Sequence, residues 1–105
     1  MAVMEIAGTQ IEVDPEGFMI KHEEWTRDIA TRLASDEGIE ELTERHWAVL
    51  EFMRKEFEEK GTAPSIRRLK QTGVVPVKEL YALFPGGPAK KASKIAGLPK
   101  PKGCV

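Results

Sequence analysis

The segment 44–60 constrains the fold more than any other part of this 105-residue chain. Its large apolar side chains recur at intervals of three and four residues, which places them on one face of a helix. They are Trp47, Leu50, Met53 and Phe57, with Val49 and Phe52 at the margins. Thr43 suits the N-cap position, and Gly61 to Pro64 break the pattern. The segment predicts a central core helix within a single domain.

The other face of this helix is charged and is expected to be solvated. It carries Arg45, Glu51, Lys55, Glu58 and Glu59. His46 lies next to Trp47. We interpret this residue as structural or exposed rather than as a general base, because a lone histidine next to a tryptophan is more often structural or at the surface.

The N-terminal third predicts a β-hairpin followed by a helix. Residues 3–20 alternate apolar and polar side chains and contain two turn sequences, at 7–9 and 14–17. An isolated hairpin is marginally stable, so it should pack on the helices. Trp25, Ile29 and Leu33 form an apolar stripe that predicts a helix over 23–36, ended by Gly38.

The C-terminal half predicts three short helices. Ser65 can cap the first, with Ile66 and Leu69 inward and Arg67, Arg68 and Lys70 outward. Pro76 begins the second, whose apolar stripe is Val77, Leu80, Tyr81 and Phe84. This outline resembles a helix-turn-helix. It is a weak signal for DNA, because the second helix carries only Lys78 and Glu79 as charged residues.

The last predicted helix, 89–96, carries Lys90, Lys91, Ser93 and Lys94, and Gly97 ends it. Residues 98–105 then predict a mobile arm, because Pro99 and Pro101 cannot continue a helix. The arm carries Cys104, the only cysteine, after the flexible Gly103. We therefore expect one domain over 1–97, with helices over 23–96, and a tethered thiol. A frayed terminus with an incidental cysteine is the alternative.

Charge is divided unevenly along the chain. Residues 1–60 carry 16 acidic and 7 basic residues, whereas residues 61–105 carry one acidic and 9 basic residues, for a net charge of −1. A basic half favours an acidic protein or a nucleic acid as partner. Interleaving of the two halves in the fold is the alternative interpretation.

Composition excludes several classes of protein. One cysteine cannot form an internal disulfide, and with only His22 and His46 beside it no Cys/His metal cluster is expected. No apolar run approaches the ~20 residues of a membrane span, and we expect no signal peptide. No phosphate-binding loop, catalytic triad or paired-carboxylate motif is found, so no cofactor is expected. These features favour a reducing cytoplasm, in which the thiol stays free.

The sequence of the C-terminal quarter resembles the DsrC/TusE family. The likeness rests on Leu-Phe-Pro-Gly-Gly-Pro-Ala-Lys at 83–90, Ile-Ala-Gly-Leu-Pro-Lys-Pro at 95–101 and the penultimate Cys104. It extends to the turn at 14–18, the Trp25 region, the segment 37–39, the His46 helix and residues 63–64. The family comprises the gamma subunit of dissimilatory sulfite reductase and the sulfur-relay protein TusE.

This resemblance implies a mainly α fold: a small helical bundle with a helix-turn-helix-like segment, an N-terminal hairpin and a mobile arm. It also implies that Cys104 carries sulfur as a persulfide. In the sulfite-reducing branch a second cysteine lies eleven positions earlier, where this chain has Ser93. A hydroxyl cannot form a sulfur–sulfur bond, so the chain resembles the one-cysteine, TusE-like branch.

Members of that branch are expected to act as sulfurtransferases only together with partners. They accept persulfide sulfur from an upstream donor complex and pass it to a thiouridylase that makes 2-thiouridine in tRNA, which implies indirect contact with tRNA. Lys100 and Lys102 should favour the Cys104 thiolate, and the Val105 carboxylate opposes them. Residues expected to support or dock partners are Lys100, Lys102, Gly103, Lys90, Lys91, Lys94 and Arg67.

Two other functions stay open. The chain could be a binding module, either a DsrC-like subunit or regulator that docks on sulfite reductase or, less in keeping with the sequence, a DNA-binding protein. It could also be a diverged one-cysteine paralogue that serves a sulfur-oxidising or sulfur-storing pathway.

Overall fold

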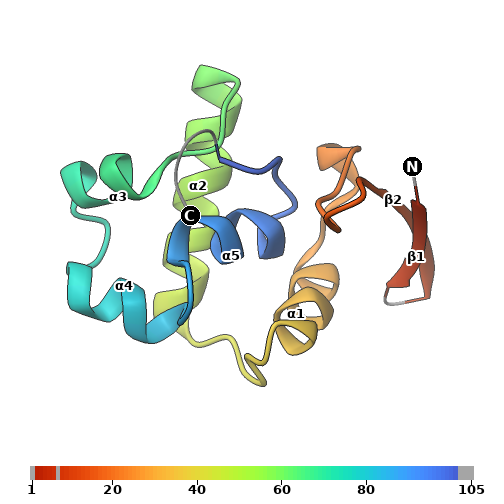
Figure 1. Ribbon diagram of the computed structural model, residues 1–105, viewed down its shortest axis with the longest axis horizontal. Helices are drawn as coiled ribbons and strands as arrows, with labels where there is room; N and C mark the ends of the chain where they lie inside the picture. The colour runs from red at the N-terminus through yellow and green to blue at the C-terminus, as the bar shows by residue number, and fades with distance from the viewer. Residues whose placement is uncertain (1, 7, 102–105) are drawn as a thin grey trace.

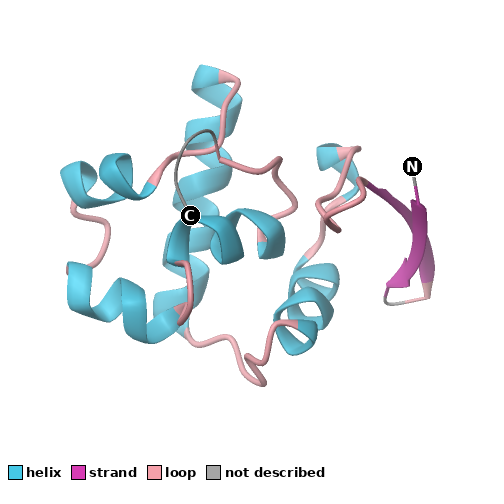
Figure 2. Ribbon diagram, in the orientation of Figure 1, coloured by secondary structure: helices cyan, strands magenta, loops and turns pink. Residues whose placement is uncertain are grey.

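The computed structural model describes residues 2–6 and 8–101 (Figure 1). Cys104 therefore lies outside the described residues, together with Lys102 and Gly103. The elements are β1 (Ala2–Ile6), β2 (Thr9–Val13), a short 3-10 helix (His22–Glu24), α1 (Arg27–Asp36), α2 (Glu44–Lys60), α3 (Ile66–Thr72), α4 (Val77–Leu83) and α5 (Pro88–Ile95). The expectation of a mainly helical fold with an N-terminal hairpin is confirmed, and the hairpin lies at one end of the molecule (Figure 2).

The helix around which the others are arranged is α5, not α2. It contacts α1, α2, α3 and α4 (Figure 1). Small side chains permit this close approach, since Ala89, Ala92, Ser93 and Ala96 are all fully buried. Periodicity arguments rest on large apolar residues, so the sequence pointed instead to the longer α2.

Helix α2 follows the predicted pattern with one exception. Val49, Leu50 and Met53 are fully buried, and the aromatic residues of the same face are half-buried. Gly61 ends the helix with φ of 74°, a left-handed conformation that suits glycine. The exception is Glu56, which is only 6% exposed although sequence reasoning gave it no role.

The hairpin forms as expected but ends earlier than residue 20. β1 and β2 pair antiparallel from Ala2↔Val13 to Ile6↔Thr9, and β1 contacts α1. After β2 the chain turns at Asp14, whose Oδ1 accepts the N–H groups of Glu16 and Phe18, both at 2.9 Å. A single bridge, Val13↔Met19, continues the pairing.

Helix α1 begins later than predicted. Thr26 is its N-cap residue, and the Thr26 Oγ1 accepts the Ile29 N–H at 3.2 Å. Trp25 therefore precedes the helix and does not belong to the stripe of Ile29 and Leu33. Its indole lies instead against the end of α5, as described below.

Helices α3 and α4 form the predicted helix-turn-helix-like pair, with two corrections. Ser65 caps α3 and Leu69 is buried, but Arg68 turns inward to Glu56 instead of outward. On α4, Leu80 is buried, as is the C-cap residue Phe84, whereas Val77 and Tyr81 are 39% and 47% exposed. Among the described residues, no helix is long and apolar enough to cross a membrane.

Candidate functional site at the root of the C-terminal arm

The first four residues of the predicted arm, 98–101, lie against the body of the protein. Leu98 is 1% exposed and its N–H donates to the carbonyl of Ser93 at 2.9 Å. Lys100 Nζ lies 3.1 Å from the Glu16 carboxylate, and Pro101 is buried. The mobility expected of the arm stays a prediction, and Cys104 lies beyond the described residues.

The carbonyls at the end of α5 are bound by side chains from distant parts of the chain. Trp25 Nε1 donates to Ile95 O at 2.8 Å, and Arg54 Nη1 donates to Ala96 O at 2.8 Å. The His22 ring lies with its Nδ1 2.7 Å from Gly97 O, so Nδ1 is the donor. The last carbonyls of a helix have no partners within it, and these three side chains supply them. We call His22, Trp25 and Arg54 the carbonyl clamp.

The three clamp residues also support one another. The Arg54 guanidinium lies over the Trp25 ring at 4.4 Å from its centroid, and its Nη2 donates to His22 O at 3.0 Å. The His22 ring meets the edge of Phe57 at 4.7 Å between centroids. Burial lowers the pKa of Arg54, and nearby Glu58 opposes that shift. The cation is thus held in a partly desolvated site, where hydrogen bonds to carbonyls are strong.

Ser93 lies at the turn of α5 nearest to the arm root. It is fully buried, and within the described residues its Oγ has no hydrogen-bond partner. Its own carbonyl accepts the Leu98 N–H, so the residue lies directly under the start of the arm. The position at which the resemblance implies a second cysteine in the sulfite-reducing branch therefore lies in the core beneath the arm root.

Open cavities flank the arm root on two sides. One of about 280 Å³ is lined by Leu98 together with His22, Glu23, Arg54, Phe57 and Glu58. Another of about 160 Å³ lies between Pro99–Lys100 and Gly61–Ala63. The arm root thus runs between the clamp on one side and the end of α2 on the other.

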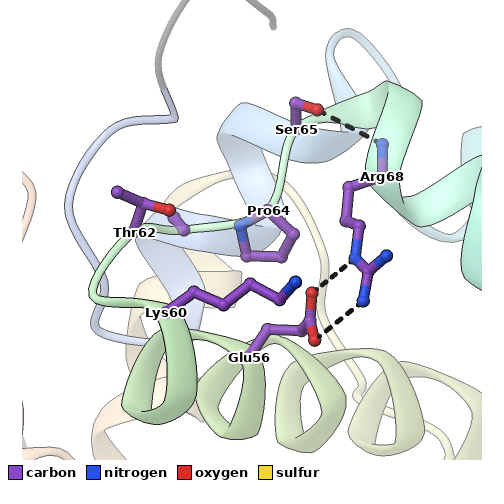
Figure 3. Close-up of a pocket in the computed structure, with 7 residues that line it drawn as sticks. Glu56, Lys60, Thr62, Pro64, Ser65 and Arg68 are labelled. Atoms are coloured by element: carbon purple, nitrogen blue, oxygen red, sulfur yellow. Dashed lines mark hydrogen bonds and ion pairs between the residues drawn. The ribbon is translucent and has the colours of Figure 1, made fainter.

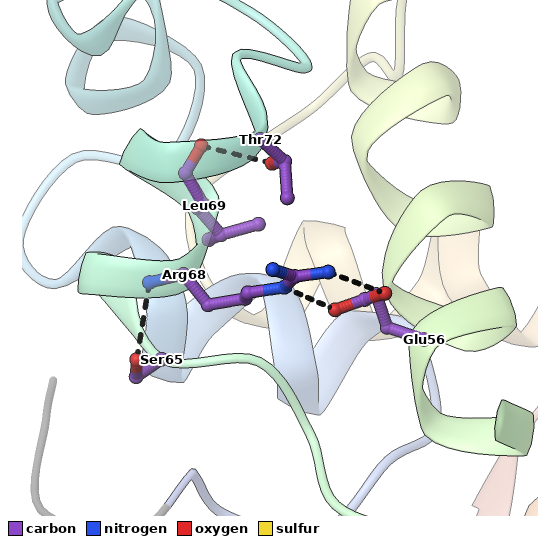
Figure 4. A network of polar contacts seen from close by, with 5 residues as sticks. All are labelled: Glu56, Ser65, Arg68, Leu69 and Thr72. Carbon is purple, nitrogen blue, oxygen red and sulfur yellow. Dashed lines mark hydrogen bonds and ion pairs between the residues drawn. The ribbon is translucent and has the colours of Figure 1, made fainter. Parts of the chain in front are cut away.

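A third cavity, of about 290 Å³, shares Thr62 and Ala63 with the second and is lined by an ion pair between the buried Glu56 and the partly exposed Arg68 (Figure 3). Arg68 Nε donates to Glu56 Oε1 at 2.7 Å and Nη2 to Oε2 at 3.3 Å, which links α3 to α2 (Figure 4). These bonds lower the pKa of Glu56, although burial opposes the shift. Sequence reasoning missed this pair because a Glu within a charged stretch indicates a solvated side chain.

The predicted docking lysines do not form one cluster of equivalent residues. Lys94 pairs with Glu37 at 3.5 Å and lies 5.9 Å from the Phe18 ring centroid, so it takes part in internal packing. Lys90 and Lys91 are half-exposed on α5, and Arg67 is exposed on α3. Lys100 is held by Glu16. Lys102 and Gly103 lie outside the described residues.

His46, considered above as a catalytic candidate, has a structural role. Its Nδ1 accepts the Thr43 N–H at 3.0 Å, and its Nε2 lies 3.0 Å from Leu83 O. Both ring nitrogens are therefore occupied by the backbone, in agreement with the interpretation from sequence. In the described part of the chain, no three His, Cys, Asp or Glu side chains are grouped to hold a metal ion.

Comparison with known proteins assigns the chain to a family. Residues 5–105 match the family described as DsrC like protein. The chain is 37% identical to the sulfite reductase, dissimilatory-type subunit gamma, of Nitratidesulfovibrio vulgaris, over the full length of both. It is 43% identical to the sulfurtransferase TusE of Yersinia pseudotuberculosis, over 97% of this chain and 100% of that protein.

A solved structure agrees with this assignment. The NMR structure of Allochromatium vinosum DsrC matches with a TM-score of 0.84 at 40% identity, over 98% of this chain and 97% of that one. Sequence and fold thus agree over nearly the whole length of the two chains. The chain belongs to the DsrC/TusE family.

Proposed function

We propose that this protein is a sulfur carrier that holds sulfur as a persulfide on Cys104. The observation that supports it most directly is the combination of a single thiol with an arm root that is anchored to the body. The name sulfurtransferase TusE, borne by a relative 43% identical over its full length, points the same way. A carrier needs a thiol and a defined attachment to the protein; Cys104 is the one thiol, and the bonds at the arm root support such an attachment.

The proposed chemistry is an exchange between sulfur atoms. The Cys104 thiolate attacks the outer sulfur of a donor persulfide, a new sulfur–sulfur bond forms at Cys104, and the donor leaves as a thiolate. The transferred atom keeps its oxidation level, so no external oxidant or reductant is required. In the second step, an acceptor thiolate attacks the outer sulfur of the Cys104 persulfide, and Cys104 leaves as a thiolate.

Ser93 supports transfer to another protein rather than storage within this chain. With one cysteine in 105 residues, no second thiol can attack the persulfide from within. The buried Ser93 hydroxyl forms no sulfur–sulfur bond in its place. We therefore favour a TusE-like relay, in which an upstream protein persulfide is the donor and a thiouridylase acting on tRNA is the acceptor.

A second candidate is a DsrC-like protein that docks on a dissimilatory sulfite reductase or regulates it. It is favoured by the full-length match to the gamma subunit of that enzyme. The surface that would serve docking in either case includes Lys90, Lys91 and Arg67, whose charges are unpaired in the described part of the chain. Docking predicts binding that survives Cys104→Ser, whereas sulfur carriage requires the thiol.

The experiment that tests sulfur carriage is intact-mass spectrometry after exposure to glutathione persulfide. We expect the wild-type protein to gain the mass of one sulfur atom, located at Cys104 by peptide mapping. Cys104→Ser is the matched control and should gain nothing, since a hydroxyl is not a nucleophile for sulfane sulfur under these conditions. An unmodified wild-type protein, with the reagent shown to be active on a free thiol, would overturn the proposal.

A further inference from the structure

The carbonyl clamp binds the point from which the arm starts. Gly97 O, bound by His22, belongs to the residue that joins α5 to Leu98. Ala96 O and Ile95 O, bound by Arg54 and Trp25, are the two carbonyls before it. Three consecutive carbonyls are therefore fixed by side chains that come from outside α5, namely from the 3-10 helix, the loop before α1 and α2.

We propose that His22, Trp25 and Arg54 are positioning residues for sulfur transfer. They fix the direction in which the arm leaves α5, and so determine where on the surface Cys104 is presented to its partners. This inference rests on the proposed function of Cys104 as a sulfur carrier. It concerns residues that the resemblance to relatives did not single out for this role.

Covalent geometry limits how far Cys104 can lie from the last anchored residue of the chain. With residues 98–101 packed, Cys104 is three residues beyond the buried Pro101, and a chain that long spans at most about 10 Å. If the clamp opened together with the contacts of residues 98–101, the tether would start near Ile95, nine residues before Cys104, and its maximum span would be about 30 Å. A shorter tether confines the thiol to a smaller volume and raises its effective concentration at one docking place by about an order of magnitude.

The other contacts of the arm root do not replace the clamp. Lys100 and Glu16 form an ion pair whose side chains are 43% and 49% exposed, and exposed pairs contribute little to stability. Leu98 is buried and its N–H donates to Ser93 O, so these contacts hold the residue after the three carbonyls that the clamp binds. The three hydrogen bonds of the clamp, one from a partly buried arginine, are a stronger constraint than the exposed Lys100–Glu16 pair.

The test places a nitroxide spin label on Cys104 and measures paramagnetic broadening of backbone amide signals by NMR. Cys104 is the only cysteine, so the native chain is labelled at one site. In the wild type we expect broadening near Glu16 and near Thr62, which neighbour the arm root. The elements β1 and α4 lie away from it on opposite sides of the molecule and should be broadened little (Figure 1).

The variants separate hydrogen bonding from packing. His22→Phe keeps an aromatic ring next to Phe57 but removes the N–H donor to Gly97 O. Trp25→Phe likewise keeps an aromatic ring but removes the indole N–H that donates to Ile95 O. His22→Asn is the rescue, because its amide nitrogen can donate from nearly the position of Nδ1. The double variant His22→Phe with Trp25→Phe should broaden β1 and α4 severalfold more than the wild type, and His22→Asn should retain the wild-type pattern.

Two outcomes would overturn the inference. One is a broadening pattern in the double variant that matches the wild type while circular dichroism shows a native fold. The other is paramagnetic broadening of equal size in all the elements of the wild type. If the double variant does not fold, the single variants and hydrogen exchange at the Leu98 amide, which donates to Ser93 O, give the same comparison. No sulfur is loaded in these measurements, so failure of the clamp and failure of sulfur carriage are distinguished.

Discussion

The indole of Trp25 occupies the space that a Cβ atom on Gly97 would need. A Cβ built on Gly97 would lie 2.5 Å from Trp25 Cδ1 and 2.9 Å from Cγ, closer than nonbonded carbon atoms approach. Gly97 also has φ of +73°, a region that other residues avoid. Only glycine at this position lets α5 end against the indole that binds its carbonyl.

We expect Gly97→Ala to lower the free energy of unfolding by about 2–4 kcal/mol, the sum of a left-handed backbone and an overpacked contact. Urea denaturation at neutral pH measures this value. Gly61→Ala is the matched control, because Gly61 has φ of +74° and nothing within 4 Å of its Cβ position. It should cost only about 1–2 kcal/mol, the backbone contribution alone.

Equal losses in the two glycine variants would show that the Trp25 contact adds nothing to the backbone effect. They would also remove the packing argument for the clamp. Trp25 would then contribute to the arm root through its hydrogen bond to Ile95 O and its contact with the Arg54 guanidinium.

Substitution of Ser93 is expected to raise the free energy of unfolding, the opposite of the effect expected for Gly97. Its hydroxyl is fully buried and, among the described residues, has no partner, a situation that costs stability. We expect Ser93→Ala to raise the free energy of unfolding by up to about 1 kcal/mol. Thermal and urea unfolding measure it. Ser65→Ala is the control, because it removes the α3 cap and should lower stability by about 1 kcal/mol.

A loss of stability in Ser93→Ala larger than that in Ser65→Ala would contradict this account. It would mean that the hydroxyl finds a partner in solution beyond the residues that the structure describes. The position would then deserve a search for that partner among residues 102–105.

The fold was predictable where large residues repeat at regular intervals. The stripe of Leu50 and Met53 defines α2, and Thr43 with Gly61 marks its ends. The central place of α5 was not predictable, because its buried face consists of Ala and Ser, which carry little periodic signal. Trp25 was assigned to α1 because its spacing to Ile29 fits a helix. Thr26 instead caps the helix, so Trp25 precedes it and contacts the arm root.

Of the proposed site, the sequence supplied only the thiol. Cys104 is the one cysteine, and its proposed role follows from the resemblance to the family rather than from the residue pattern alone. The clamp could not be read from the sequence, since His22 and Arg54 act on backbone carbonyls more than forty positions away and no side-chain pattern marks a carbonyl. Lys94 looked equivalent to Lys90 and Lys91, and only the fold shows that Glu37 binds it.

His46 is expected to matter for stability and not for sulfur loading. Its ring binds the Thr43 N–H and Leu83 O, so His46→Leu leaves two polar backbone groups without their partner. The free energy of unfolding should fall by about 2–4 kcal/mol, as for other buried polar groups that lose their bonds. Lys55→Leu, at an exposed position of the same helix, should change it by less than about 0.5 kcal/mol.

The second measurement on His46→Leu is sulfur loading of Cys104 at a temperature where the variant is folded. Loading by glutathione persulfide should equal that of the wild type. A folded His46→Leu protein that fails to load would give the histidine a part in the chemistry and would contradict its structural role.

The Glu56–Arg68 pair predicts how stability depends on pH. Hydrogen bonds from Arg68 hold the pKa of Glu56 below its ordinary value of 4.5. The unfolded chain therefore binds a proton at Glu56 before the folded protein does, so stability from the pair is complete above the ordinary pKa and is lost as the pH falls below it. The urea concentration at the unfolding midpoint, measured between about pH 3 and 6, should fall as the pH is lowered. The reason is that unfolding in this range takes up as much as one proton at Glu56.

Glu56→Gln should remove that part of the pH dependence, because an amide does not titrate, and should lower stability at neutral pH by breaking the charged pair. Glu40→Gln is the matched control: Glu40 is exposed and makes no ion pair within the described residues, so its substitution should leave the slope unchanged. If wild type and Glu56→Gln lose stability in parallel below pH 4.5, Arg68 does not hold the pKa of Glu56 below its ordinary value, and the pair adds nothing to the pH dependence of stability.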